Sequence, residues 1–161
     1  REEELLKIAF NEMPKIPGIH ILADNVRERL GIISFYLDNI HFNLAVKLLN
    51  DHFGIQLRGG GARARTHGPL FLHVSPHTSK EITDRINFGD LSRKPGWIRV
   101  SLHPTMTDEE LYFIIDAIKQ VQQNHIEWRK AYTYNNKTNE FKHIDEPVDK
   151  TELVAPWFEL D

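Results

Sequence analysis

The fold is decided by the stretch Pro95-Gly-Trp-Ile-Arg-Val-Ser-Leu-His103, which leads into Pro-Thr-Met-Thr-Asp-Glu-Glu110 and then a long apolar-periodic segment. Apolar and polar residues alternate in its first part, so that Ile98, Val100 and Leu102 share one side. This alternation predicts a strand over 97–102 with one buried face.

A helix is predicted directly after this strand. Thr107 and Glu110 have the spacing of a capping box, and the acidic residues between them suit the first turn of a helix. Apolar residues then recur at helical spacing, at Leu111, Ile114, Ile115, Ile118 and Val121. Together these signals predict a helix over 107–129.

Composition sets the class of protein. The chain has 161 residues, 40% of them hydrophobic and 27% charged, which is typical of one globular domain with a core. Its net charge of −3 gives no electrostatic reason to bind nucleic acid, and no apolar run is long enough for a membrane span. The absence of cysteine excludes disulfides and thiol nucleophiles and fits a cytoplasmic protein. Because the chain begins with Arg1 instead of Met, we expect a fragment or a processed product.

Other elements are predicted on both sides of the opening stretch. A helix over 2–13, strands over 19–22 and 31–37, a helix over 39–53 capped by Gly54 and a strand over 55–58 precede it. The nearly continuous apolar run over 31–37 predicts a central strand covered on both faces, paired as a hairpin with 19–22.

The remaining segments complete the predicted fold. A second capping box, Thr78 with Glu81, predicts a short helix to Phe88, and 132–134 with 140–142 predicts a β-hairpin. The sequence thus predicts an α+β two-layer sandwich, with a small, mostly antiparallel sheet and helices on one face. We divide the chain into a domain over 1–130 and a hairpin with an extended tail over 131–161 that packs on it.

Arg58 and Arg99 are the candidate binding residues. Arg99 lies in mid-strand on the side away from the aliphatic residues, and Arg58 lies in a strand that leads into Gly59, Gly60 and Gly61. If their strands are neighbours, the two guanidiniums meet one carboxylate or phosphate. The alternative is that both are ordinary surface arginines paired with acidic side chains.

Two weaker signals stand beside this pair. The three glycines could form an anion-binding loop through their N–H groups, but they lack a phosphate-loop ending and could equally be a flexible loop. His103 follows the Arg99 strand and could line the same site. His67, His73 and His77 have no metal-binding spacing, so we expect no metal site.

The order of these segments resembles a known family. Ile16-Pro-Gly-Ile19, Gly31-Ile-Ile-Ser-Phe35, Arg58-Gly-Gly60 and the stretch from Pro95 to His103 are similar to the C-terminal small domain of class V pyridoxal-phosphate (PLP) aminotransferases and cysteine desulfurases, including selenocysteine lyase-like proteins. The resemblance spans roughly 2–128 and implies the small domain of a PLP-transferase of fold type I.

This resemblance implies a role for the arginines. In the family the arginine that matches Arg99 binds the substrate α-carboxylate, and the one that matches Arg58 lies near the active site. The partners implied are an amino-acid substrate, a large PLP-binding domain of the same chain and a second copy in a homodimer, with no nucleic acid and no membrane.

The sequence departs from the family in two ways. Desulfurases carry a reactive cysteine near the positions of Gly61 and Arg63, and without it the persulfide route is closed. The family's PLP lysine lies in the large domain, so we expect PLP in the full-length parent and none on this fragment. The expected function is therefore a substrate-carboxylate-binding small domain, inactive by itself. The alternative is a freestanding, non-enzymatic module that binds a small carboxylate or a protein partner.

Overall fold

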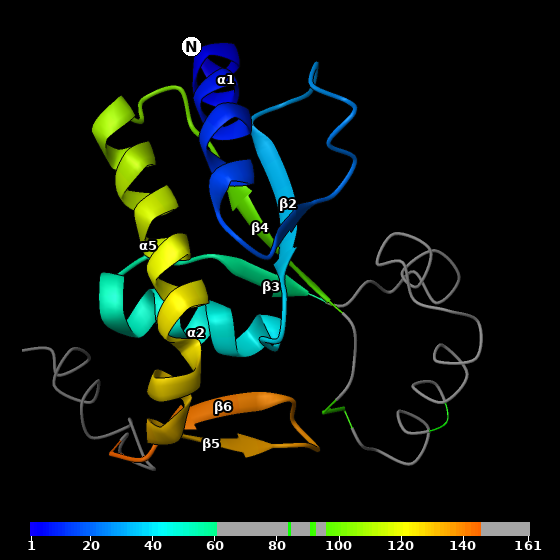
Figure 1. The fold of residues 1–161 in the computed structure, drawn as a ribbon, viewed down its shortest axis with the longest axis vertical. Coiled ribbons are helices and arrows are strands. Elements are labelled where there is room, and N and C mark those ends of the chain that lie inside the picture. Colours follow the sequence, from blue (N-terminus) through cyan, green and yellow to red (C-terminus); the bar gives the residue numbers. More distant parts are fainter. Residues whose placement is uncertain (61–83, 85–90, 93–95, 146–161) are drawn as a thin grey trace, which may run out of the picture.

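The computed structural model describes residues 1–60, 84, 91–92 and 96–145, and its arrangement is shown in Figure 1. An antiparallel sheet has the strand order β1-β2-β4-β3, where the strands are β1 Ile19–Ile21, β2 Ile32–Leu37, β4 Trp97–Ser101 and β3 Arg58–Gly60. The helices α1 Glu2–Glu12, α2 Phe42–Phe53 and α5 Asp108–Trp128 cover one side of it. The predicted α+β class is confirmed.

The stretch from Trp97 to Glu110 folds as predicted. In β4, Ile98 and Val100 are buried, whereas Arg99 and Ser101 on the opposite side are exposed. The N-cap of α5 is Thr107, whose hydroxyl accepts the Glu110 N–H at 3.1 Å while the Glu110 carboxylate accepts the Thr107 N–H at 2.8 Å. This reciprocal pair satisfies two donors that a helix start otherwise leaves free.

β2 is central, as predicted, but within the described part of the chain the helices cover only one of its faces. It pairs with β1 on one edge and with β4 on the other. Its residues alternate: Ile33 and Phe35 are fully buried under the helices, whereas Ile32 on the other face is 40% exposed. The apolar run led to the wrong prediction because hydrophobicity alone does not reveal whether a second layer covers the strand.

Two element boundaries differ from the prediction at α2 and β3. The helix begins at Phe42 instead of residue 39, because Asn39 has a left-handed φ of 62° and His41 is the N-cap. Gly54 is the left-handed C-cap, as predicted, with φ of 69°. After it the chain reaches the sheet only at Arg58, so the predicted strand over 55–58 is wrong and β3 is Arg58–Gly60.

A second small sheet closes the other end of the helices. The predicted hairpin is confirmed as β5 Tyr132–Asn135 and β6 Glu140–His143, which follow the short 3-10 helix Arg129–Ala131 (a similar one, Met13–Lys15, follows α1). The Tyr132 hydroxyl donates to the Asp51 carboxylate at 2.9 Å, and the Asn43 side-chain amide donates to the Asn139 carbonyl. The hairpin is thereby attached to α2.

Two predicted segments lie outside the described residues, namely the helix that begins near Thr78 and Glu81 and the tail over 146–161. Across the part of the chain that is described, none of the helices combines the length and the apolar character that a membrane crossing needs.

The His41 ring caps α2 from a largely aromatic pocket. Its Nδ1 accepts the Asn43 N–H at 3.1 Å. The rings of Phe42, Tyr134 and Phe141 lie around it, with centroid separations of 4.6, 5.7 and 5.5 Å. Burial lowers the pKa of His41 to about 4, with a smaller lowering from the charge of Arg129 and an opposing effect of the Leu91 carbonyl. At neutral pH the ring is therefore uncharged and its Nδ1 is free to accept.

We expect this ring to make stability depend on pH. The unfolded chain binds a proton at His41 below about pH 6.5, while the folded chain resists it down to about pH 4. Stability is therefore fully present above about pH 6.5 and falls as the pH drops toward 4. With screening around this partly exposed ring, the loss is about 1–2 kcal/mol.

Urea unfolding near neutral pH and at about pH 4.5 measures this loss. His41→Asn is the matched variant, because asparagine caps a helix but does not titrate. It should lose about 1–2 kcal/mol less than the native chain over the same interval. Equal losses in the two proteins would contradict the prediction.

Candidate functional site

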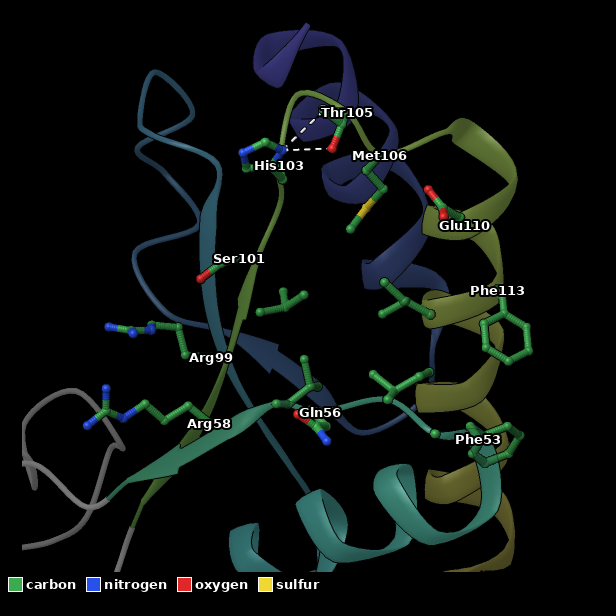
Figure 2. A pocket seen from close by; sticks show the side chains of 15 residues that line it. Phe53, Gln56, Arg58, Arg99, Ser101, His103, Thr105, Met106, Glu110 and Phe113 are labelled. Carbon is green, nitrogen blue, oxygen red and sulfur yellow. Dashed lines mark hydrogen bonds between the residues drawn. The ribbon is translucent and has the colours of Figure 1, made fainter. Parts of the chain in front are cut away.

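Arg58 and Arg99 are direct neighbours across the strands β3 and β4. Their Cα atoms are register partners in the antiparallel ladder, and Ser34 of β2 is the partner of Arg99 on its other side. The three residues therefore form one row across three strands, on the face that the helices leave uncovered. Figure 2 shows both arginine side chains extending to the same side of β4. The predicted neighbourhood of the two strands is confirmed.

Both guanidiniums are open to solvent. Arg58 and Arg99 are exposed, and among residues 1–60 and 96–145 no carboxylate forms an ion pair with either of them. The alternative of two arginines neutralised by surface acids finds no support in this part of the chain. A pair of adjacent, unneutralised guanidiniums is suited to an anion supplied from outside.

A groove of about 720 Å³ lies beside this row. It is bordered by β4, by the segment that precedes Arg58 and by the start of α5. Gln56, Arg58, Arg99 and Ser101 line one part of it. The other part lies toward α5 and is mainly apolar, with Phe53, Leu57, Met106, Phe113 and Ile114. In Figure 2 the arginine side chains extend away from Phe113 and Met106, on the opposite side of β4, so the guanidiniums lie apart from the apolar wall of the groove.

Glu110, the acidic residue among the described residues that line this groove, is already hydrogen-bonded. The Glu110 carboxylate accepts the Thr107 N–H at 2.8 Å and completes the helix cap. In Figure 2 it lies beside Met106, on the α5 side, away from the arginines. It therefore stabilises the start of α5 and does not pair with the arginines.

His103 lines the same groove, at the end of β4. Its Nδ1 lies 2.8 Å from the Thr105 hydroxyl and 3.3 Å from the Thr105 N–H, which holds the exposed ring at the turn into α5. Figure 2 places it well above the arginine row, with Ser101 between them. The structure thus brings His103 to the groove but not to the guanidiniums.

The predicted glycine loop is wrong for Gly59 and Gly60, and Gly61 lies outside the described residues. Gly59 and Gly60 belong to β3 and pair with Ile98 and Trp97. A Cβ on Gly59 would lie 3.0 Å from the Phe42 ring and 3.1 Å from the Asn43 side chain. Glycine is used there because α2 packs closely on the strand.

Sequence reasoning missed the polar residues that share the open face. Ser34 lies next to Arg99, and further along the face the His20 and Tyr36 rings stack at 4.6 Å while His20 Nε2 lies 3.0 Å from the Asp38 carboxylate. Burial and the charge of Asp38 raise the pKa of Tyr36. The alternation in 32–37 was the available signal, but the apolar run obscured it.

The histidines provide no metal centre in the described part of the chain. No group of three or more His, Asp or Glu side chains there is arranged to hold an ion. The sequence candidates His67, His73 and His77 lie outside the described residues.

The chain is similar to known proteins in sequence and in structure. The crystal structure of the cysteine desulfurase CsdA from Escherichia coli is similar to this chain with a TM-score of 0.47 and 18% sequence identity, over 76% of this chain. The similar region is only 24% of that structure, so this chain spans about a quarter of its length. A search of curated proteins gives no match. The sequence profile described as aminotransferase class-V matches residues 1–113, and the chain therefore belongs to the aminotransferase class-V family.

Proposed function

We propose that this chain is the substrate-carboxylate-binding small domain of a PLP-dependent class V enzyme, and that the cofactor is held by residues outside it. The observation that carries the proposal is the direct pairing of Arg58 with Arg99 on an uncovered sheet face, without a described counter-ion. Membership of a family of PLP-dependent enzymes supplies the chemical context. In this role Arg99 and Arg58 bind the carboxylate and orient the bonds at Cα.

The residues on this face do not fit PLP by themselves. The cofactor is attached to its enzymes through a lysine, and none of the described residues lining the groove beside the arginines is a lysine. The donors present are two guanidiniums and hydroxyls, which suit a carboxylate. The proposal therefore assigns this chain substrate binding and no step of the cofactor chemistry.

The proposal is tested in the protein encoded by the complete reading frame that contains residues 1–161. We expect Arg99→Gln to raise KM for the amino-acid substrate by about tenfold to thirtyfold, since it removes a charged hydrogen-bonding pair. The PLP absorbance of the variant should equal that of the native enzyme, because Arg99 holds the substrate and not the cofactor.

Arg27→Gln is the matched control. Arg27 is an exposed arginine, remote from β4, whose guanidinium lies 5.2 Å from the centroid of the Phe10 ring. Its replacement by glutamine removes the same charge as Arg99→Gln. An unchanged KM in Arg99→Gln, or an equal rise in Arg27→Gln, would contradict the proposed role. A reading frame that begins near Arg1 and a product without PLP would favour the freestanding module instead.

A further inference from the structure

We propose that the row of Ser34, Arg99 and Arg58 selects a doubly charged oxyanion, a dicarboxylate or a phosphate, over a single carboxylate. This inference deepens the proposed function, on which its meaning for the substrate class rests. If it holds, the natural substrate is an amino acid that carries a second acidic group.

The charges of the two arginines favour a dianion. Residues directly opposite in an antiparallel pair have Cβ atoms only about 4.5–5.5 Å apart, and like charges in such positions repel. Arg58 and Arg99 are in these positions, and no carboxylate among residues 1–60 and 96–145 forms an ion pair with them. A single carboxylate neutralises one of the two charges. A dianion neutralises both, so it gains more from the site.

The hydrogen-bonding groups of the row also favour a ligand with several anionic oxygens. Guanidinium groups are donors only, and each presents a planar fork that binds two oxygen atoms. The hydroxyls of Ser34 and Ser101 flank Arg99 on the same face, as partner and near neighbour along the strand. The Glu110 carboxylate is held in the cap of α5. A ligand with several anionic oxygens therefore meets donors without meeting a competing free carboxylate of the groove.

Both arginine side chains are accessible to a ligand from the same side. In Figure 2 the Arg58 and Arg99 side chains extend side by side from neighbouring strands, and both are exposed. Their guanidiniums extend away from α5 and from the apolar wall of the groove, so a small ligand reaches them from solvent on the open side of β4. Two separate acidic groups, or one phosphate, can thus reach both forks.

The test uses the purified 161-residue chain and isothermal titration calorimetry at a fixed ionic strength and about pH 8, where succinate is a dianion, its monomethyl ester a monoanion and phosphate mainly a dianion. The probes are succinate, its monomethyl ester and inorganic phosphate. We expect the tighter of succinate and phosphate to bind at least about tenfold more tightly than the monomethyl ester. Succinate as the tighter ligand assigns a second carboxyl group to the substrate, and phosphate assigns a phosphate ester.

Substitutions test whether the row of Ser34, Arg99 and Arg58 causes this preference for dianions. Arg58→Gln and Arg99→Gln should each bring the dianion within about threefold of the monoanion, while Arg27→Gln keeps the native ratio. Without ligand, Arg58→Gln and Arg99→Gln should each raise the melting temperature by about 1–3 °C, because they remove the repulsion.

Three results would overturn the inference. These are equal binding of succinate, phosphate and the ester, loss of the preference in Arg27→Gln, and a lower melting temperature for both row variants without ligand. Because these measurements need neither PLP nor turnover, they can fail while the KM effect of Arg99→Gln stands, and the reverse also holds.

Discussion

Replacing Phe35 by alanine is expected to destabilise the fold by about 3–5 kcal/mol, the largest single effect that we foresee. Phe35 is fully buried in the central strand β2, between partners on β1 and β4 and beneath the helices. Its removal leaves a cavity where three elements meet, and the sheet holds its neighbours too firmly to fill that space. Urea unfolding monitored by circular dichroism measures the loss.

Tyr36→Ala is the matched control, one residue further along the same strand. Tyr36 is only half-buried and lies on the open face, where it stacks on His20. Its removal should cost about 1 kcal/mol or less beyond the change in strand propensity, because water already reaches the ring. Equal losses for the two variants would show that the open face of the sheet is covered in solution.

Gly96→Ala is expected to cost about 2–3 kcal/mol although it adds only one methyl group. A Cβ at Gly96 would lie 2.4 Å from Cε1 of Phe42 and 2.9 Å from its Cγ. Phe42 is 6% exposed and begins α2, so the whole ring would have to move and not only its tip. Thermal unfolding, compared with the native chain, measures the cost.

Two further variants isolate the cause. Gly60→Ala is the control, because a Cβ there meets no atom within 4 Å, and we expect a change within about 0.5 kcal/mol. Phe42→Leu shortens the obstructing ring, so Gly96→Ala should be less costly in that background by about 1 kcal/mol or more. Strictly additive losses would mean that the ring is not what the new methyl group meets.

The predicted features that held are those that local patterning decides. The period-two pattern of Trp97–Ser101 gave β4 its buried and exposed sides. The reciprocal hydrogen bonds of Thr107 and Glu110 need only four consecutive residues, and Gly54 needs only its own freedom to adopt a positive φ. Each of these preferences is satisfied by neighbours in the chain, which is why it could be read from the sequence.

The errors have the opposite origin. β3 begins at Arg58 because this is the first residue of its segment that pairs with β4. Its partner, Arg99, lies 41 positions later in the chain. Whether Gly59 belongs to a loop or a strand depends on α2, which packs against it. Whether helices cover one face of β2 or both likewise depends on how distant segments of the chain pack against the sheet.

By itself, the sequence determined the α+β class, the C-cap of α2, the N-cap of α5 and the side of β4 on which Arg99 stands, because these follow from short-range periodicity and hydrogen bonding. Only the tertiary structure decided that Arg58 stands directly opposite Arg99 beside Ser34, on the face that α1, α2 and α5 do not cover. Strand pairing is set by contacts between residues that are distant in the chain, and such contacts leave no local pattern.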